Sequence, residues 1–270
     1  AERDPRPCSA LPRNRGAGHE VSSVGAMQRR GNESRCGVLP RNVRQRIKKA
    51  RRGGAKLVLG GPFRGLLNGL DAGATGALAE ELQDLGHITD LSFSRCELGP
   101  ERLAIIFPTL LSLAHLATLN LFSNNLGRRG AELLAGVAGQ LSMLERLWLG
   151  GNSLTGAGVA AVVRALKTCP HLRCLDVSDN AVDAVEAVEV ARALRNGLAL
   201  ETLFISHNDL GPDGERAIVL AMCSSTTTLQ ILDSGISGGI VLNRHLAALG
   251  LDLAAFRDAD NDAILGFLRD

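Results

Sequence analysis

Aromatic side chains are scarce in this 270-residue sequence: they make up 3% of it, tyrosine is absent and tryptophan occurs once. A large globular core normally uses such rings, which bury more apolar area than any other side chain. Packing must therefore come from leucine, valine and alanine, together with 31 glycines. Side chains this small suit thin, closely stacked layers.

Long hydrophobic runs are also missing. No stretch of about 18 apolar residues occurs, so no membrane span is expected, and no apolar segment typical of a secretion signal opens the chain. The six cysteines lack the regular spacing of a disulfide framework, which favours reduced thiols in an intracellular protein. Cytoplasm, nucleus and organelle matrix all remain open.

Motifs for catalysis and for cofactor binding are absent as well. The sequence contains neither the phosphate-binding G-x-x-x-x-G-K-[ST] loop nor a G-x-G-x-x-G loop that follows a strand. The stretch 258–269 begins like a calcium loop but lacks the glycine and the final glutamate that this loop needs. Cys169, His171 and Cys174 have no second pair to complete a zinc site. We therefore predict a protein that is not an enzyme, with no cofactor, metal or small-molecule substrate.

What the sequence does contain is a repeat of 28 residues, L-x-x-L-x-L-x-x-N-x-L, in which related residues substitute in some columns. Five consecutive units begin at Ile88, Leu116, Leu144, Leu172 and Leu200. A weaker unit begins at Leu229. One period before the first unit, Phe63, Asn68 and Leu70 occupy the expected columns of a degenerate unit.

This repeat resembles the leucine-rich-repeat superfamily, over about residues 57–240. Its length resembles the ribonuclease-inhibitor-like class, which also includes Ran GTPase-activating proteins and the sensor regions of NOD-like receptors. The resemblance implies an α/β solenoid, or horseshoe, with parallel strands on the concave face and helices on the convex face. It implies little about function.

The recurring apolar and asparagine positions of the repeat can be explained by the structure that each part of the unit forms. Alternating apolar residues in each unit predict short strands, over residues 90–94, 118–122, 146–150, 174–178 and 202–206. Spacing such as Val159, Val162, Val163 and Leu166 predicts a helix in the second half of each unit. A buried amide where the strand ends can satisfy turn backbone groups in its own layer and the next. This column holds Asn68, Asn124, Asn152, Asn180 and Asn208, with Cys96 in one unit.

Charge divides the chain into parts. Residues 1–56 hold 15 of the 30 basic residues and four acids, a net charge of +11, whereas the rest of the chain has a net charge of −9. We predict an extended or disordered basic arm over residues 1–55 and a solenoid over 56–240. Residues 241–270 are expected to form a helical C-terminal cap, because an uncovered end layer would expose its core.

Two surfaces are candidates for binding. The outward strand positions carry the single tryptophan and two of the seven phenylalanines, so we expect a protein partner to dock around Trp148, Phe122, Arg146, Asp176, Asp179 and Phe204. Gly150 and Gly151 should leave room there for a partner side chain. In the alternative interpretation, Trp148 and Phe204 shield one another or lie under the C-terminal cap.

The second surface is the basic run 41–52, whose candidate contacts are Arg44, Arg46, Lys48, Lys49, Arg51 and Arg52. Such a run can pair with nucleic-acid phosphates, contact an acidic protein or serve as a targeting signal. A solvated tail is the alternative. No aromatic residue is interleaved, so stacking on bases is not supported.

Together these features predict a non-catalytic protein–protein interaction module that binds its partner on the concave face, without contact to a membrane. The alternative is a structural subunit of a large assembly, ribonucleoprotein or organellar, anchored by the basic N-terminal arm. A role as a regulator of GTPases rests on analogy of fold alone.

Overall fold

Strands and helices alternate along the chain in the computed structural model, which describes residues 38–61, 66–196, 198, 200–222 and 231–233. The helices are α1 (Arg41–Arg51), α2 (Ala72–Gln83), α3 (Gly99–Leu110), α4 (Gly127–Ala138), α5 (Gly156–Leu166), α6 (Ala184–Arg195) and α7 (Gly211–Met222). The strands are β1 (Lys56–Val58), β2 (Asp90–Ser92), β3 (Thr118–Asn120), β4 (Arg146–Trp148), β5 (Cys174–Asp176), β6 (Thr202–Phe204) and β7 (Ile231–Asp233).

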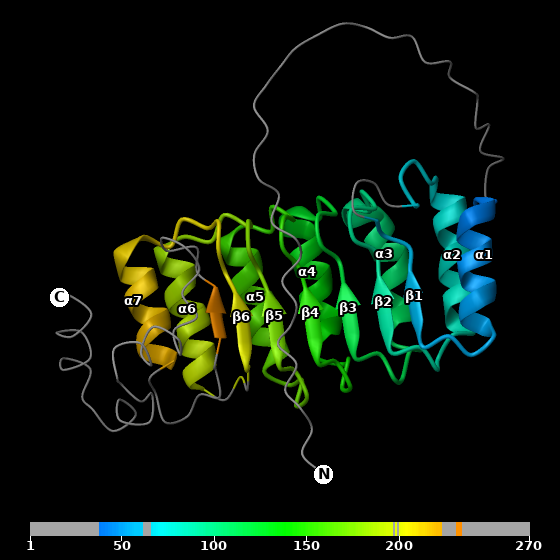
Figure 1. Ribbon diagram of the computed structural model, residues 1–270. Helices are drawn as coiled ribbons and strands as arrows, with labels where there is room; N and C mark the ends of the chain where they lie inside the picture. The colour runs from blue at the N-terminus through cyan, green and yellow to red at the C-terminus, as the bar shows by residue number, and fades with distance from the viewer. Residues whose placement is uncertain (1–37, 62–65, 197, 199, 223–230, 234–270) are drawn as a thin grey trace, which may run out of the picture.

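The strands form one parallel sheet in sequence order, β1 to β7. Figure 1 shows the strands in a row, with the helices behind them on one face of the sheet. Leu119 pairs with Leu147, and Leu147 with Leu175, so neighbouring strands from β2 to β6 are offset by one 28-residue period. The predicted α/β solenoid and its five central strands are confirmed.

Each of these five strands is two residues shorter than predicted. Hydrogen bonds between repeats nevertheless continue beyond the strand, because the Phe93 N–H donates to Asn120 O and the Arg95 N–H to Phe122 O, both at 2.8 Å. Extended geometry ends at Arg95 and its equivalents, which have a left-handed φ near +55°.

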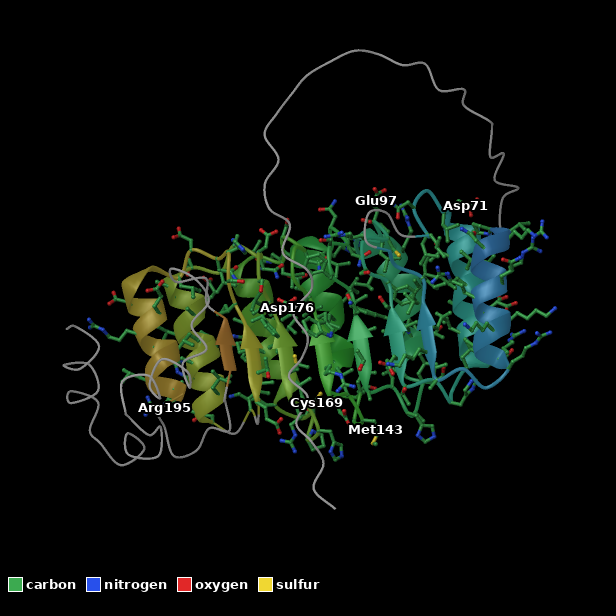
Figure 2. The ribbon with its side chains drawn as sticks, viewed as in Figure 1. Asp71, Glu97, Met143, Cys169, Asp176 and Arg195 are labelled. Atoms are coloured by element: carbon green, nitrogen blue, oxygen red, sulfur yellow. The ribbon has the colours of Figure 1, made fainter. Side chains whose placement is uncertain are left out.

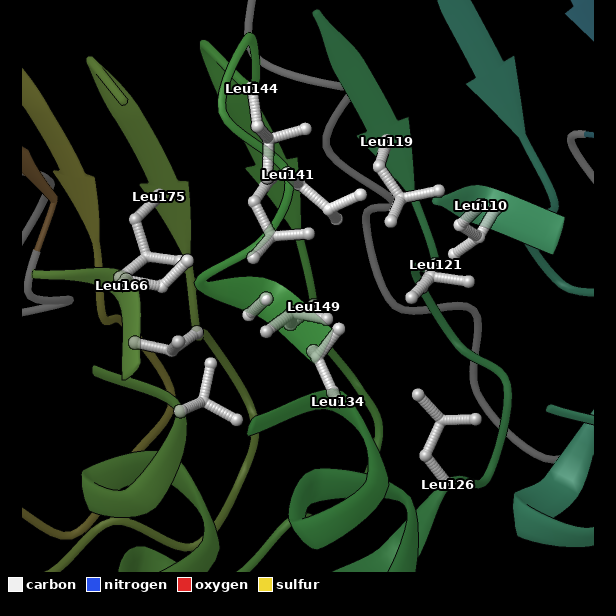
Figure 3. Close-up of a cluster of buried hydrophobic side chains, with 14 of the residues drawn as sticks. Leu110, Leu119, Leu121, Leu126, Leu134, Leu141, Leu144, Leu149, Leu166 and Leu175 are labelled. Atoms are coloured by element: carbon white, nitrogen blue, oxygen red, sulfur yellow. The ribbon is translucent and has the colours of Figure 1, made fainter. Parts of the chain in front are cut away.

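The core lies between the sheet and the helices. Figure 3 shows leucines of the strand segments, such as Leu119 and Leu149, meeting leucines of the helices, such as Leu134. All three are fully buried. A single repeat is too thin to enclose such a core, so each layer depends on its neighbours for burial.

The first repeat departs from the expected register. Strand β1 pairs Leu57 with Leu91, an offset of 34 residues and not 28. Asn68, in contrast, lies 28 residues before Cys96, and the buried Leu78 and Leu82 of α2 lie 28 residues before Ile106 and Leu110 of α3. Six residues are therefore inserted between the strand and the turn. The prediction that Phe63 occupies the column of Leu91 is wrong, because Leu57 of β1 pairs with Leu91 and is buried, as is Leu59 directly after the strand. Phe63 itself lies outside the described residues.

The predicted boundary of the basic arm is also wrong. Residues 41–51 form helix α1, whose Val43, Ile47 and Ala50 lie on one face and are buried. The helix covers the first layer, so the solenoid begins before residue 56. The remainder of the predicted arm, residues 1–37, and the predicted cap over 241–270 lie outside the described residues.

Buried asparagines connect successive turns. Asn152 Oδ1 accepts the Asn124 N–H of the preceding turn at 2.8 Å, and its Nδ2 donates to Leu121 O, Leu149 O and Gly150 O at 2.9, 2.7 and 3.3 Å. Similar bonds recur at Asn124, Asn180 and Asn208. We refer to these four side chains as the asparagine ladder.

The ladder predicts a large cost for truncation. Asn152→Ala should lower the free energy of unfolding by about 1–3 kcal/mol, because buried turn groups lose their partners. Chemical denaturation measures this change. Asn196→Ala, at an exposed helix end, is the matched control and should cost less than about 0.5 kcal/mol. Equal midpoints for Asn152→Ala and the wild type would contradict the role of the ladder.

Cys96 takes the place of an asparagine in the second repeat. Its Sγ donates to Leu59 O at 3.4 Å, a bond that corresponds to that of Asn124 Nδ2 with Phe93 O once the six inserted residues are counted. Burial raises the pKa of the Cys96 thiol from 9.0 to about 12. The thiol is therefore a neutral hydrogen-bond donor.

This raised pKa predicts a pH dependence of stability. The contribution of the neutral thiol is fully present below pH 9 and is lost as the pH rises toward 12. Between about pH 9.5 and about pH 11, the free energy of unfolding of the wild type should fall faster than that of Cys96→Ser, by roughly 1.4 kcal/mol per pH unit. Serine keeps a donor but does not titrate in this range. Parallel pH profiles of the two proteins would contradict the assignment.

Candidate partner-binding face

The strand register places the predicted anchor residues in one row. Trp148 of β4 pairs with Asp176 of β5, which pairs with Phe204 of β6. All three alternate with buried leucines, so they project from the opposite side of the sheet to the core. The predicted outward orientation of this row is confirmed.

The two rings of this row meet across the intervening strand. The ring centroids of Trp148 and Phe204 are 5.6 Å apart with an interplanar angle of 28°, a stacked arrangement. Both residues are half-buried. The alternative interpretation, in which they shield one another, therefore describes part of their surroundings correctly, although each ring residue keeps some exposed surface.

Asp176 lies between these two residues in the row, and its 5% exposed fraction makes it a buried residue. Figure 2 shows it in the middle of the row of strands. Its Oδ1 accepts the Ser178 N–H at 2.9 Å, as Asn120 Oδ1 accepts the Phe122 N–H at the same repeat position two repeats earlier. Asp176 therefore helps to end its strand, which limits its availability to a partner.

Phe122 lies beside this row, two residues after Asn120, which pairs with Trp148. The Arg95 guanidinium lies 5.5 Å from the centroid of its ring, a cation–π contact. A β-carbon built on Gly150 would lie 3.0 Å from two carbons of the Phe122 ring and 2.8 Å from Asp176 Oδ2.

The expectation that Gly150 leaves room for a partner side chain is therefore wrong. The space above Gly150 is already filled by Phe122 and Asp176. Gly151 is no more open, because a β-carbon there would lie 2.9 Å from Ser123 Oγ. These two glycines serve the packing of the face itself.

Arg146 and Asp179 lie at the margin of this group. Arg146 Nε donates to Thr118 Oγ1 at 3.0 Å, and its guanidinium is 3.6 Å from Glu145. Asp179 is exposed, in the turn after β5, with a φ of 53°. The structure thus brings Phe122, Trp148, Asp176 and Phe204 together, with Arg146 and Asp179 beside them. We refer to these six residues as the aromatic face.

Arg95 belongs with the aromatic face and was not among the predicted site residues. In the sequence, Arg95 occupies the same repeat position as Asp179, one residue before the asparagine column. This shared position is the feature that could have indicated Arg95. A 28-residue offset alone did not indicate that its guanidinium turns back over Phe122, because that depends on side-chain conformation.

The predicted absence of metal and membrane sites stays a prediction for the whole chain. The described residues contain no group of three or more His, Cys, Asp or Glu that could hold a metal ion, and no described helix is long and apolar enough to cross a membrane. Cys96 and Cys169 are buried free thiols. Cys169 Sγ donates to Ala138 O at 3.0 Å, so this thiol contributes to packing.

Two of the predicted basic contacts have structural partners. Arg46 donates to Val58 O at 2.6 Å, and Arg51 forms ion pairs with Glu81 and Asp84 at 3.1 and 2.7 Å. The other four, Arg44, Lys48, Lys49 and Arg52, are exposed on or beside α1.

Sequence comparison agrees with this geometry. A family model described as Leucine Rich repeat matches residues 112–135 and 168–185. This chain carries a leucine-rich-repeat solenoid of the ribonuclease-inhibitor-like class. The solenoid extends over more repeats than the two matched segments, as the continuous sheet from β1 to β7 shows.

Three curated proteins are similar to part of this chain. Protein NLRC5 of Ictalurus punctatus is 27% identical over 51% of this chain and 8% of its own length. Ribonuclease inhibitor of Sus scrofa is 27% identical over 61% of this chain and 43% of its own length. Tonsoku-like protein of Mus musculus is 36% identical over 43% of this chain and 9% of its own length. The chain thus spans less than half the length of each of these relatives.

The packing above Gly150 generates a prediction. Gly150→Ala should lower the free energy of unfolding by roughly 1–3 kcal/mol, because Phe122 and Asp176 must move to admit the methyl group. Gly136→Ala is the control: this exposed helical glycine has no atom within 4 Å of a built β-carbon. That change should stabilise the protein by up to about 1 kcal/mol. A neutral Gly150→Ala would mean that the space above Gly150 is open after all.

Proposed function

We propose that this protein is a non-catalytic binding module whose concave face docks a protein partner at the aromatic face. Leucine-rich-repeat proteins generally mediate protein–protein interaction, and the Sus scrofa relative is by its name an inhibitor of ribonuclease. The fold makes a binding role reasonable but does not select the surface.

The stack of Trp148 on Phe204 is the observation that carries the proposal. Tryptophan and arginine are enriched among the residues that dominate binding energy, and they act from the centre of an interface. Here Trp148 and Phe204 project from outward strand positions, and Phe122 and Arg95 contact each other just after strands β3 and β2, in a chain whose aromatic content is only 3%. Core packing does not require rings on this side of the sheet.

Rigidity adds to the suitability of this surface. Trp148 and Phe204 lie on strands, and their mutual contact restricts their side chains before any partner arrives. Because less conformational freedom is lost on binding, a surface of this kind binds more tightly than the same residues on a mobile loop.

Substitution of Trp148 tests the proposal. The assay uses a partner first captured by the wild-type protein and then purified, with affinity measured by calorimetry. Trp148→Ala should weaken this binding by about 2 kcal/mol or more, roughly 30-fold, because a central anchor is lost. The lost stack with Phe204 should cost about 0.5–1.5 kcal/mol of stability, so the protein stays folded.

Val185→Ala is the matched control, since Val185 is 70% exposed on helix α6, on the opposite side from the strands. Its affinity should equal that of the wild type. Asp179→Lys should mainly change the association rate, because an exposed charge at the margin steers encounter. Asp176 is unsuitable for charge reversal, since it is buried. Unchanged affinity of folded Trp148→Ala would refute the proposed surface.

A further inference from the structure

Helix α1 has two faces of opposite character. Val43, Ile47 and Ala50 are buried against the first layer. The cations Arg41, Arg44, Lys48, Lys49 and Arg52 are all exposed, and we refer to these five residues as the basic face. No acidic residue occurs in the helix. The helix therefore presents charge of a single sign to solvent.

The periodicity of the helix aligns these cations. Arg41, Arg44, Lys48 and Arg52 are separated by three or four residues, so they follow one stripe opposite the buried face. An α-helix rises 1.5 Å per residue, so this stripe is about 16 Å long. Because the apolar side of α1 is held in the core, the stripe is fixed in direction and is not part of a mobile tail.

The structure also separates the available cations from those already in use. Arg46 donates to the Val58 carbonyl, and Arg51 is paired with Glu81 of α2 and with Asp84, which directly follows α2. The charge of Arg51 is therefore partly neutralised by these two carboxylates, and theirs by Arg51. Arg46 and Arg51 are therefore left out of the basic face.

We propose that the basic face of α1 binds the phosphate backbone of a nucleic acid without reading its sequence. Regularly spaced cations of one sign complement a regular polyanion, and arginine matches phosphate in a two-bond geometry. No aromatic residue lies on this helix, so bases have nothing to stack on. Contacts to phosphates alone position a nucleic acid but carry no sequence information.

Other classes of partner fit this face less well. Insertion into a membrane surface needs an exposed apolar face, and that of α1 is buried. A protein partner would find no apolar anchor among Arg41, Arg44, Lys48, Lys49 and Arg52. The distribution of charge along the sequence favours the same conclusion: residues 41–52 contain seven basic residues and no acid, whereas residues 57–270 have a net charge of −9. An acidic body disfavours nucleic acid elsewhere on the chain.

Salt dependence measured on the full chain tests this proposal. Fluorescence anisotropy would follow binding to a labelled duplex DNA of about 20 base pairs and a single-stranded RNA of about 20 nucleotides, both of mixed sequence. Each phosphate contact contributes about −0.9 to the slope of log K against log salt for duplex and about −0.7 for single strands. The triple variant Arg44→Gln, Lys48→Gln, Arg52→Gln should bind at least about 10-fold more weakly and lose up to about 2.7 from the duplex slope.

A second triple variant controls for net charge. Arg129→Gln, Arg164→Gln and Lys167→Gln remove the same charge from exposed positions on or next to α4 and α5. It should keep the affinity and slope of the wild type, and both variants should melt as the wild type does. Absence of binding by the wild type, an equal loss in both triple variants, or tighter binding to poly-glutamate than to either nucleic acid would overturn the proposal.

Discussion

The hydrogen bonds of the asparagine ladder are the interaction on which this architecture depends. A parallel solenoid must turn its chain sharply after every strand, and each turn leaves backbone groups that water cannot reach. One amide at each turn joins its own layer to the layer before it: Asn152, for example, bonds groups of both the third and the fourth strand segments. Burial of the leucines stabilises the solenoid, and the asparagine ladder supplies hydrogen-bond partners to the backbone groups that are buried at the turns.

Periodicity made much of the fold predictable. Strands β2 to β6 and the helices that follow them could be located because apolar spacing changes from 2 to 3.6 residues within each unit. The first repeat escaped this reasoning. Phe63 happens to lie one period before Leu91, so a single-period extrapolation preferred it to Leu57, and nothing in the spacing indicated six inserted residues.

Helix α1 was missed for a different reason. Its buried residues, Val43, Ile47 and Ala50, do have helical spacing, yet seven basic residues in the run 41–52 dominate its composition. A run of cations is usually solvated, and only the three buried side chains distinguish a capping helix from a tail. On the concave face, the sequence correctly placed Trp148, Asp176 and Phe204 in one row. It could not indicate that Asp176 is buried or that Phe122 fills the space above Gly150, since both depend on side-chain conformation.

The offset of the ladder bonds also has a consequence for how such a chain can change in length. Each of these bonds joins residues 26, 28 or 31 apart when it crosses between layers, and two or three apart within a layer. Duplication or deletion of one whole period between Asn124 and Asn208 would leave every remaining bond with an equivalent partner. The first layer has no such freedom, because α1 covers it with Val43, Ile47 and Ala50 and stands where a preceding repeat would be. Translational symmetry therefore makes the middle of this solenoid extensible, whereas its N-terminal end is closed to further repeats.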